Sequence, residues 1–549
     1  MSNPDREPPG TLLLFAPSHS GGHQEIVLRP EPTNSPNDPL TWPMWRKTWH
    51  ASVLVVITGL AAGLSTLSGA ASFAMNQELG ITPDKFNIAV AVLFVGIGGG
   101  TYLMSPLPRL VGRRLSYVLS LVAGIIGCVL LAKVENTGVL IVSHLFLGVA
   151  ESCAEAMVQH SLADIFYEHQ RGHAMGLYVL ALSGGTFMGP MAAGLIASAR
   201  GWRAIGWIGA SCCGLMLVVM LLTLEETAFD RAEHARQELC LRNGDLGKPG
   251  HCQHLEYPTD EERPADTVAI TQMVSKSYLQ RIKLVTPVSP SKRELLRGFC
   301  YRLRHSPRCF VFPAVLFSGL QWGAQIAFLT FYLSVEDVQY FAPPWNYSDK
   351  AVAIMGVPSL IGLLVGIIYA SVFADYFVVW MARKNNGILE AEHRLWLILP
   401  ASVIGSLGLL LFGIGSQRGW AWIVPYFGLG CIGFTWGCAG DISLSYMQQV
   451  YSEAILECMV GVAVINNIFG CSLTFAAGTS ILVLAQAGHA NMRKGPWLDK
   501  QTPTQVFSVL AVINFLVTLT AVPMIFWGKR LRAHTAKSYF QFVEKMNSA

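Results

Sequence analysis

Apolar runs long enough to cross a bilayer recur along nearly the whole chain, and they constrain the fold more than any other feature. About 20 apolar residues in a helix span roughly 30 Å of hydrocarbon, because each residue adds about 1.5 Å. The composition agrees, since 52% of the 549 residues are hydrophobic and only 13% are charged, against roughly a quarter in soluble domains. We place twelve helical spans at 49–73, 86–106, 115–133, 138–160, 174–199, 203–224, 309–334, 351–377, 395–415, 420–446, 455–486 and 505–527.

A polar stretch separates the spans into two groups of six. The sequence therefore predicts an all-α integral membrane fold with two six-helix bundles and a central cavity between them, as in transporters built from parallel repeats. We find no convincing amphipathic element in the polar stretch. The predicted divisions are a cytosolic N-terminal tail (1–48), a first bundle (49–224), a cytosolic linker (225–308), a second bundle (309–527) and a cytosolic C-terminal tail (528–549).

The positions of the basic residues, rather than the net charge of +4, predict the orientation. The loops on the side of the two termini, taken together with the segments that flank the first and last spans, hold more Arg and Lys than the opposite loops, which places both termini in the cytosol. Residues 1–40 contain no continuous apolar stretch, so we expect no cleavable signal peptide. The triplet Asn346-Tyr347-Ser348 falls in a predicted outer loop, and Asn346 is a candidate glycosylation site, although such triplets also arise by chance.

Several function classes find no support in the sequence. There is no polybasic tract for nucleic acid, and most cysteines lie inside apolar runs without the spacing of zinc ligands. We find no paired metal ligands, nucleophile elbow or phosphate-binding loop, which argues against an enzyme and against ATP-driven pumping. We expect no cofactor or metal, a small-molecule substrate, the lipid bilayer as partner, and a monomer.

Local motifs give the chain a family resemblance over most of residues 25–540. It resembles the fungal drug:proton antiporter branch of the major facilitator superfamily, whose members have twelve spans. The resemblance rests on Asn37-Asp38-Pro39-Leu40-Thr41-Trp42-Pro43 before the first span, Gly112-Arg113-Arg114 after the second, Asp164 with Arg171-Gly172 after the fourth, Gly185, Gly189-Pro190 and Gly194 in the fifth, Glu225-Glu226-Thr227 after the sixth, and Asn385-Asn386-Gly387 with Glu392, Arg394 and Leu395 after the eighth.

Some positions depart from the family pattern. Arg109 stands where the resemblance implies an Asp three residues before Gly112, and His144 stands where it implies an Arg in span four. Gln449 and Asn466 likewise replace an expected Asp and Arg near spans ten and eleven. The resemblance therefore implies a transporter in which ion coupling differs from the family pattern.

Span four carries the clearest chemical signal. At 100° per residue, His144, Gly148, Glu151 and Glu155 fall within about 40° of one another on one helical stripe. Intramembrane carboxyls are rare unless they face a cavity or a partner, and a carboxyl or imidazole there can exchange protons near neutral pH. We interpret His144, Glu151 and Glu155 as a proton and substrate pathway; the alternative is a helix packed by buried hydrogen bonds.

A second set of residues is predicted to act in gating or helix packing. Small residues one turn apart in span five permit close helix approach, and Pro190 favours a bend. Arg113 and Arg114 either pair with acidic groups when the cytosolic side closes or serve only as orientation charges. The gating and motif candidates are Gly112, Arg113, Arg114, Asp164, Arg171, Gly185, Gly189, Pro190, Gly194, Asp375 and Arg394.

Spans seven and ten supply candidates for the cavity wall. Gln321, Gln325, Tyr332 and Trp436 suit an aromatic, weakly polar cavity, although aromatics in spans also face lipid. Asp441 joins the proposed pathway because an acid at that depth needs a partner or a function. As the counterpart of span four in a parallel repeat, span ten would place Asp441 across the cavity from Glu151 and Glu155.

The resulting hypothesis is proton-coupled efflux of small, largely apolar organic molecules by alternating access, driven by the proton gradient. An importer or uniporter of the same fold, and a membrane sensor that has lost transport, remain alternatives. The resemblance implies a multi-pass protein of the plasma membrane, with a vacuolar or vesicle membrane as the alternative.

Overall fold

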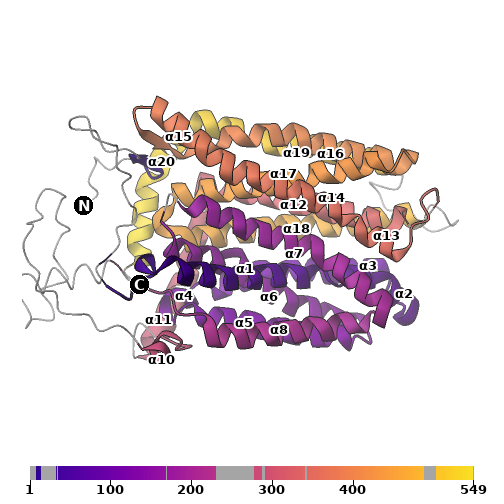
Figure 1. The fold of residues 1–549 in the computed structure, drawn as a ribbon, viewed down its shortest axis with the longest axis horizontal. Helices are drawn as coiled ribbons and strands as arrows, with labels where there is room; N and C mark the ends of the chain where they lie inside the picture. The colour runs from indigo at the N-terminus through magenta and orange to yellow at the C-terminus, as the bar shows by residue number, and fades with distance from the viewer. Residues whose placement is uncertain are drawn as a thin grey trace, which may run out of the picture.

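The computed structural model describes residues 8–13, 33, 35–167, 170–229, 231, 277–286, 291–340, 343–486 and 502–547. Among these residues, eleven helices are long and apolar enough to cross a membrane, and twelve if the bent pair Lys292–Val311 and Pro313–Leu329 forms one span. The long helices run side by side along the long axis, and both termini lie at the same end (Figure 1). We call that end the tail end and the opposite one the far end.

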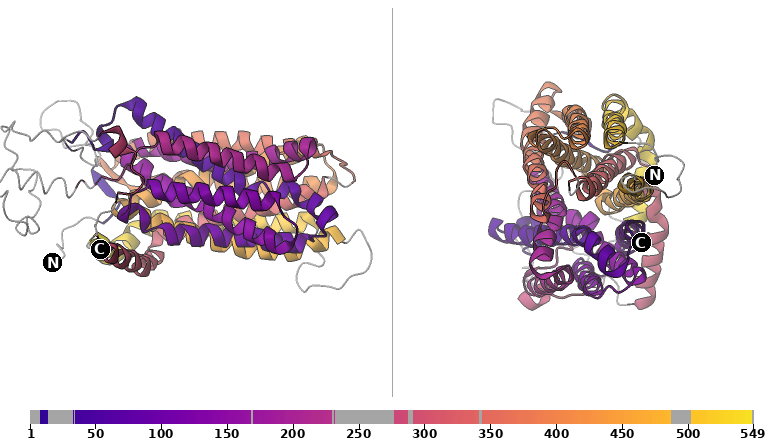
Figure 2. Two further views of the ribbon diagram at one scale, coloured as in Figure 1. Left: turned by 90° about the horizontal axis from the view of Figure 1, so that it is seen from below. Right: turned by 90° about the vertical axis from the view of Figure 1, so that its right-hand side faces the viewer.

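Two groups of helices lie beside each other, indigo to magenta for the first half and orange to yellow for the second (Figures 1 and 2). The long helices of the first half are α1 (Met44–Thr66), α3 (Pro83–Met104), α5 (Arg114–Ala132), α6 (Thr137–Ile165), α7 (Arg171–Arg200) and α8 (Arg203–Thr223). Those of the second half are α12 (Pro313–Gln339), the continuous segment α14 (Gly356–Ile367), η6 (Ile368–Phe373) and α15 (Ala374–Lys384), then η7 (Ala391–Ile398) with α16 (Leu399–Arg418), α17 (Ile423–Val450), α18 (Ile455–Gln486) and α19 (Pro503–Leu519).

Further elements connect these helices or cover the tail end. They are β1 (Thr11–Leu13), η1 (Pro39–Thr41), η2 (Gly69–Ala71), α2 (Ser72–Leu79), α4 (Leu107–Leu110), α10 (Tyr278–Arg281), α11 (Lys292–His305), η5 (Ser306–Val311), α13 (Asp349–Ile354), β2 (Ile388–Glu390), η8 (Ser452–Ala454) and α20 (Ala521–Asn547). The predicted architecture of two helical bundles is thus confirmed, with a two-stranded sheet in addition.

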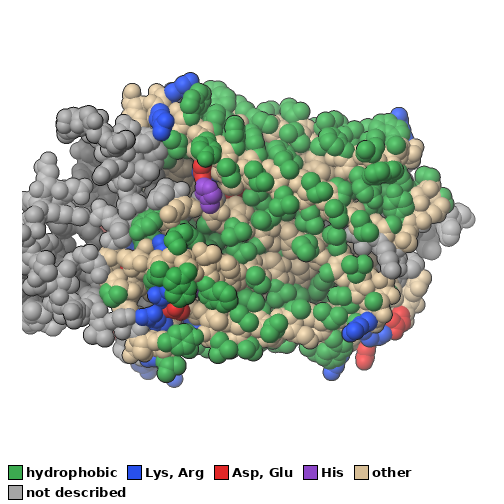
Figure 3. Space-filling model, viewed as in Figure 1, with side chains coloured by type: hydrophobic (Ala, Val, Ile, Leu, Met, Phe, Trp, Pro, Cys, Tyr) green, Lys and Arg blue, Asp and Glu red, His purple; other side chains and the backbone are tan. Residues whose placement is uncertain are grey.

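The outer surface has the polarity of a membrane protein. Apolar side chains cover the middle of the visible face, and the visible Lys, Arg, Asp and Glu side chains lie towards its two ends (Figure 3). Leu215 is 69% exposed and Phe427 is 62% exposed, on helices of opposite halves. Large apolar side chains left exposed in such a band are stable in lipid and not in water.

Local sequence signals explain where several helices begin and end. Asn136 caps α6, since its Oδ1 accepts a hydrogen bond from Val139 N at 3.0 Å. Gly80 after α2 and Gly419 after α16 adopt left-handed φ angles of 63° and 60°, a conformation that glycine adopts without steric cost. Glycines in the sequence therefore explain the positions of these two far-end turns.

Glycines let α1 and α7 approach closely. A Cβ on Gly185 would lie 2.1 Å from the carbonyl oxygen of Gly59, and one on Gly189 would lie 2.5 Å from that of Gly63. Such backbone contact requires small residues on both helices. The packing predicted for span five is therefore present within the first half.

The interface between the halves includes two helix pairs that pack side by side. α3 packs against α18, and α7 packs against α14. Gly98 of α3 contacts Asn467 of α18, while Gly176 of α7 contacts Ser371 in η6. α6 of the first half and α17 of the second half also lie at this interface, where α6 contacts α18 and α17 contacts α7.

The tail end of the second half is more ordered than the sequence predicts. β1 pairs antiparallel with β2, matching Thr11 with Glu390. Arg532 of α20 is fully buried and forms ion pairs with Glu390 at 2.9 Å and Glu392 at 2.6 Å. Figure 1 shows α20 crossing the end of the bundle. The C-terminal residues are thus a helix bound to the N-terminal strand.

The expectation that the linker lacks an amphipathic element is wrong. α11 lies within it, with Gly298 and Arg302 buried and Leu296 and Arg297 exposed. The helix is missed because its apolar residues occupy a narrow stripe between basic residues rather than a continuous run. Most of the remaining linker lies outside the described residues.

Candidate functional site

Two carboxyl groups are buried where α6 meets the second half. Glu151 is 7% exposed and Glu155 is 5% exposed. Glu155 Oε2 accepts a hydrogen bond at 3.3 Å from Asn466 Nδ2 of α18, while Glu151 Oε2 has no hydrogen-bond partner among the described residues. Within the described part of the chain, neither carboxyl forms an ion pair. A carboxylate so enclosed needs a proton or a bound cation.

An amide pair extends this contact between the halves. Gln159, one turn after Glu155, donates its Nε2 to the Glu155 carbonyl oxygen at 2.8 Å. The Gln159 Oε1 accepts from Gln448 Nε2 of α17 at 2.9 Å. Glu155 and Gln159 therefore each hold a partner on a different helix of the opposite half, so any separation of the halves here must break both bonds.

An aromatic cluster of Phe187, Trp322, Tyr332 and Trp436 also packs across the interface. The Trp436 Nε1 donates to Ser183 Oγ of α7 at 2.6 Å. The Trp436 ring centroid lies 6.0 Å from that of Phe187 and 5.3 Å from that of Trp322, and Tyr332 contacts Phe187 at 6.5 Å. This cluster lies at the plane where the sequence predicts a cavity.

The two glutamines predicted to line that cavity form hydrogen bonds within the second half. Gln321 Nε2 donates to Val517 O at 2.6 Å and to Thr520 Oγ1 at 3.1 Å. Gln325 donates to Asn514 Oδ1 at 3.1 Å. Both therefore bind the α19 side of their own half. Tyr332 and Trp436 are the members of that predicted set which contact Phe187 of the first half.

His144 is held apart from the two carboxyls. Its Nδ1 lies 2.9 Å from Leu140 O and its Nε2 lies 2.9 Å from Ser68 Oγ. Phe86 contacts the ring edge-on at 5.8 Å. All of these partners belong to the first half, and both ring nitrogens are satisfied. His144, Glu151 and Glu155 do lie on one helix, α6. Only the C-terminal part of this stripe contacts the network between the halves.

Asp441 likewise has neighbours other than those expected. Its Oδ1 accepts from Ser445 Oγ at 3.1 Å, whereas no hydrogen-bond partner for its Oδ2 is found among the described residues. The charged groups that act on it are Arg394 and Asp375. These two form an ion pair of 2.8 Å, so Asp441 belongs to a tail-end cluster of the second half.

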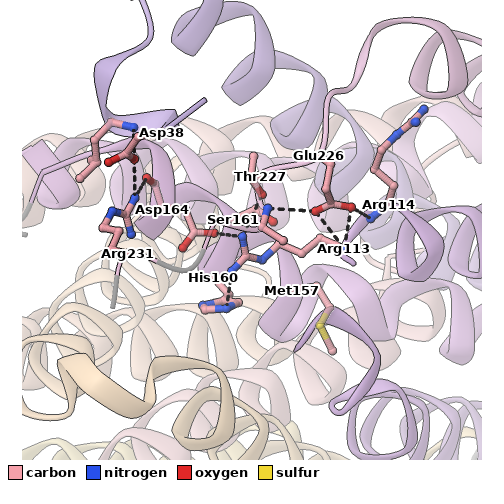
Figure 4. A network of polar contacts seen from close by, with 12 residues as sticks. Asp38, Arg113, Arg114, Met157, His160, Ser161, Asp164, Glu226, Thr227 and Arg231 are labelled. Carbon is pink, nitrogen blue, oxygen red and sulfur yellow. Dashed lines mark hydrogen bonds and ion pairs between the residues drawn. The ribbon is translucent and has the colours of Figure 1, made fainter. Parts of the chain in front are cut away.

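The predicted loop motif of the first half forms a connected network (Figure 4). Arg113 pairs with Asp164, donates to Thr227 Oγ1 at 3.2 Å and contacts His160 Nε2 at 2.9 Å. The backbone N–H of Arg113 donates to the Glu226 carboxylate at 3.0 Å. The guanidinium of Arg113 therefore joins α5, α6 and the segment after α8 within one half.

Further residues secure this network at its edges. Arg231 bridges Asp38 Oδ1 and the Asp164 carbonyl oxygen, each at 3.1 Å. Arg114 donates to Leu221 O at 2.8 Å. Gly112 has φ of 95°, and a Cβ there would lie 2.6 Å from Glu226 Oε2. Arg171 begins α7, but its side chain lies outside the described residues.

Ion pairs also join the two halves at the tail end. Arg109 Nε lies 3.2 Å from Glu457 Oε1 in the first turn of α18, and Arg302 of α11 lies 3.9 Å from the same oxygen. His173 of α7 lies 3.4 Å from Asp375. Arg109, which stands where the resemblance implies an Asp, therefore pairs with an acid in the first turn of α18.

The remaining predicted residues lie in structural or surface positions. Pro190 and Gly194 lie inside α7. Asn346 is exposed at the far end with φ of 45°, beside Tyr347, whose N–H donates to Tyr340 O at 2.8 Å. Its side chain is accessible, as a glycan acceptor requires.

Sequence reasoning missed Gln159, Gln448, Ser183 and Glu457 as members of the interface. Gln159 follows Glu155 by four residues, so the helical stripe could have been extended by one turn. Glu457 is an acid in the first turn of a span, which is a recognisable signal at a helix N-terminus. The partners of Gln448 and Ser183 come from other helices, and no local pattern predicts them.

Comparisons with known proteins agree with this architecture. The family model described as Major Facilitator Superfamily matches residues 53–478. An MFS-type transporter of Schizosaccharomyces pombe is 41% identical and aligns over 98% of this chain and 95% of its own length. The efflux pump radE of Floropilus chiversii is 24% identical over 91% of this chain and 84% of its own.

A solved structure shows the same fold. The proton:xylose symporter XylE, bound to 6-bromo-6-deoxy-D-glucose, superposes with a TM-score of 0.55 over 87% of this chain and 96% of that one. At 12% identity the similarity concerns the arrangement of helices.

Proposed function

The chain belongs to the major facilitator superfamily, and from this premise we propose that it exports small, largely apolar organic molecules in exchange for protons. The observation that carries the proposal is the enclosure of Glu151 and Glu155 without an ion-pair partner in the described chain, with Glu155 bonded to Asn466 of the other half. Proton binding neutralises Glu155, and proton loss creates a charge that favours access to water. Alternating access supplies that change of surroundings.

The aromatic cluster supports the choice of substrate class. Phe187, Trp322, Tyr332 and Trp436 offer apolar faces, with the Trp436 N–H and Ser183 as polar groups. Sites for organic solutes combine such surfaces with few polar groups. A solute that enters between the halves would displace the Trp436–Ser183 contact.

The direction of transport is proposed from the family resemblance and the packing of α7. The name of radE describes efflux and that of XylE describes symport, so the fold serves both directions. We favour efflux because Gly185, Gly189 and Pro190 of α7 are among the residues that resemble drug:proton antiporters, and Gly185 and Gly189 pack closely against α1. The alternatives are an importer and a uniporter, and the vesicle assay described below distinguishes them from an exporter.

We further propose that the tail end faces the cytosol and that the protein resides in the plasma membrane. Arg109, Arg113, Arg114, Arg383 and Lys384 all lie at the tail end, as the bias of basic residues towards the cytosol predicts. Tags at residues 20, 260 and 545 should be protected in intact cells, whereas Asn346→Cys should label from outside. A linker tag accessible from outside contradicts the orientation.

The decisive assay is reconstitution into vesicles with an imposed pH gradient. A panel of labelled compounds should include neutral and positively charged apolar molecules. Exchange is supported if a compound accumulates against its own gradient and this accumulation depends on the pH gradient. The direction of accumulation should also reverse when the pH gradient is reversed. Equilibration without pH dependence indicates a uniporter, accumulation in the direction of proton flow indicates symport, and no flux for any compound indicates a sensor.

A further inference from the structure

The linker helix α11 runs in a different direction from α12, the membrane-spanning helix that follows it. The segment Lys292–Val311 is turned by 83° from α12, which begins at Pro313. Because α12 enters the apolar layer at its tail-end terminus, the residues immediately before it lie at the level of the membrane surface. α11 therefore lies along the surface rather than across the bilayer.

Two contacts attach α11 to the helical bundle. Arg302 lies 3.9 Å from Glu457, the carboxylate that also binds Arg109. The hydroxyl of Tyr102, at the end of α3, donates to the Leu303 carbonyl oxygen at 2.6 Å. Gly298 is buried one turn before Arg302. One face of α11 is thus fixed against the protein.

The opposite face carries a basic stripe. At 100° per residue, Arg293, Arg297 and Arg304 lie within about 40° of one another and about 140° from the buried pair Gly298 and Arg302. All three arginines are exposed, and none forms an ion pair within the described part of the chain. Each guanidinium therefore has its hydrogen-bond donors available to an external anion.

An exposed apolar residue lies beside this stripe. Leu296 is 65% exposed and is placed on the helix about 80° from the arginines, and Val311, at the end of the segment, is 72% exposed. A helix that presents leucine to the acyl boundary and arginines to the headgroup layer has the pattern of an interfacial helix. Charge complementarity selects a negatively charged headgroup.

We propose that α11 binds anionic phospholipid through Arg293, Arg297 and Arg304, with Leu296 inserted at the acyl boundary. The identification of the leaflet as cytosolic rests on the proposed orientation, since anionic lipids are concentrated in that leaflet. Bound lipid would hold α11 in place, and with it Arg302 against Glu457. The lipid site is therefore linked to the ion pairs that join the halves.

The test uses the full-length chain in nanodiscs of phosphatidylcholine with and without phosphatidylserine, or in detergent with either lipid added. Native mass spectrometry counts the lipid retained, and the melting temperature reports its effect on the fold. The triple variant Arg293→Gln, Arg297→Gln, Arg304→Gln should lose at least about tenfold in preference for phosphatidylserine, because each basic residue near an anionic surface contributes roughly a fivefold gain.

Two matched variants make the result specific. Lys85→Gln, Lys133→Gln, Arg200→Gln removes the same charge at the far end and should keep wild-type preference, whereas replacing the three α11 arginines by lysine should retain most of it. Unchanged selectivity in the α11 glutamine variant, or equal loss in the far-end variant, overturns the proposal. Binding of inositol phosphate in solution without preference for phosphatidylserine nanodiscs also overturns it. The assay needs no transport, so failure of the proposed exchange leaves its outcome unaffected.

Discussion

Arg109 Nε lies 3.2 Å from Glu457 Oε1, and this ion pair joins the two halves at the tail end. Glu457 is 4% exposed and also attracts Arg302, so loss of Arg109 leaves a buried carboxylate with a weaker partner. Arg109→Glu adds a second negative charge and should destabilise this closed arrangement by about 2 kcal/mol.

A charge-swap experiment measures that coupling. Labelling of a cysteine introduced at Ser105, which is buried beside α4, should rise in Arg109→Glu and in Glu457→Arg, and should return towards the parental level in the double variant. Equal labelling in all four proteins would show that the pair does not hold the tail end closed.

Gly185→Ala should disrupt the packing of α7 on α1. The new Cβ would lie 2.1 Å from the Gly59 carbonyl oxygen, whereas a Cβ on the adjacent Gly184 has nothing within 4 Å. The helices must separate in the first case, and we expect a loss of about 2 kcal/mol in stability. Melting temperatures of Gly185→Ala and Gly184→Ala provide the comparison; equal values would contradict the close approach.

His144→Arg should lower stability rather than flatten the pH dependence of transport. Both ring nitrogens already have partners, Leu140 O and Ser68 Oγ, and the site is enclosed by Phe86. A longer, permanently charged side chain must displace these groups. Reduced abundance with an unaltered pH profile per molecule is expected, and a flattened profile at full abundance would restore His144 to the pathway.

The strand β1 should detach from the tail end in acid. Burial disfavours the Glu390 carboxylate, but hydrogen bonds from Lys529, Arg532 and Thr11 outweigh this effect and lower its pKa below 4.5. A lowered folded-state pKa stabilises the fold above the unfolded value and loses that contribution as pH falls through the folded value. Hydrogen exchange of Thr11–Leu13 should therefore accelerate below pH of about 4.5.

A matched variant checks the cause of this acid effect. Glu390→Gln should show fast exchange of Thr11–Leu13 already at neutral pH, because it cannot form the ion pair with Arg532. Slow exchange in Glu390→Gln, or exchange that is independent of pH in the parent, would rule out the carboxylate as the group that holds β1.

The long apolar runs make the fold predictable from the sequence. The partners of individual side chains are not predictable in this way. Twenty-residue apolar runs depend on bilayer thickness alone, so both halves were found from sequence. The stripe from His144 to Glu155 was also predictable, since it lies on one helix. Which part of it meets α18 depends on how the helices cross, and no pattern along α6 predicts that the His144 side chain bonds to Ser68 of its own half.

Contacts at the tail end show the same limit. Asp375 and Arg394 are both motif candidates and do pair, and they lie only 19 residues apart in the sequence. The binding of Arg532 to Glu390 and Glu392 joins residues more than 130 positions apart, and no local signal predicts it. α11 was missed because its apolar face is narrow and interrupted by arginines.

The central claim is that Glu155 binds and releases the proton that drives transport, and pH-driven flux in vesicles tests it most directly. Glu155→Gln keeps the shape and the hydrogen bond to Asn466 but cannot lose a proton. At matched protein content, its pH-driven flux should fall to the level of empty vesicles, with a milder fall for Glu151→Gln. Glu453→Gln, the same change at an exposed tail-end position, should leave flux unchanged. Wild-type pH-driven flux in Glu155→Gln would contradict the account.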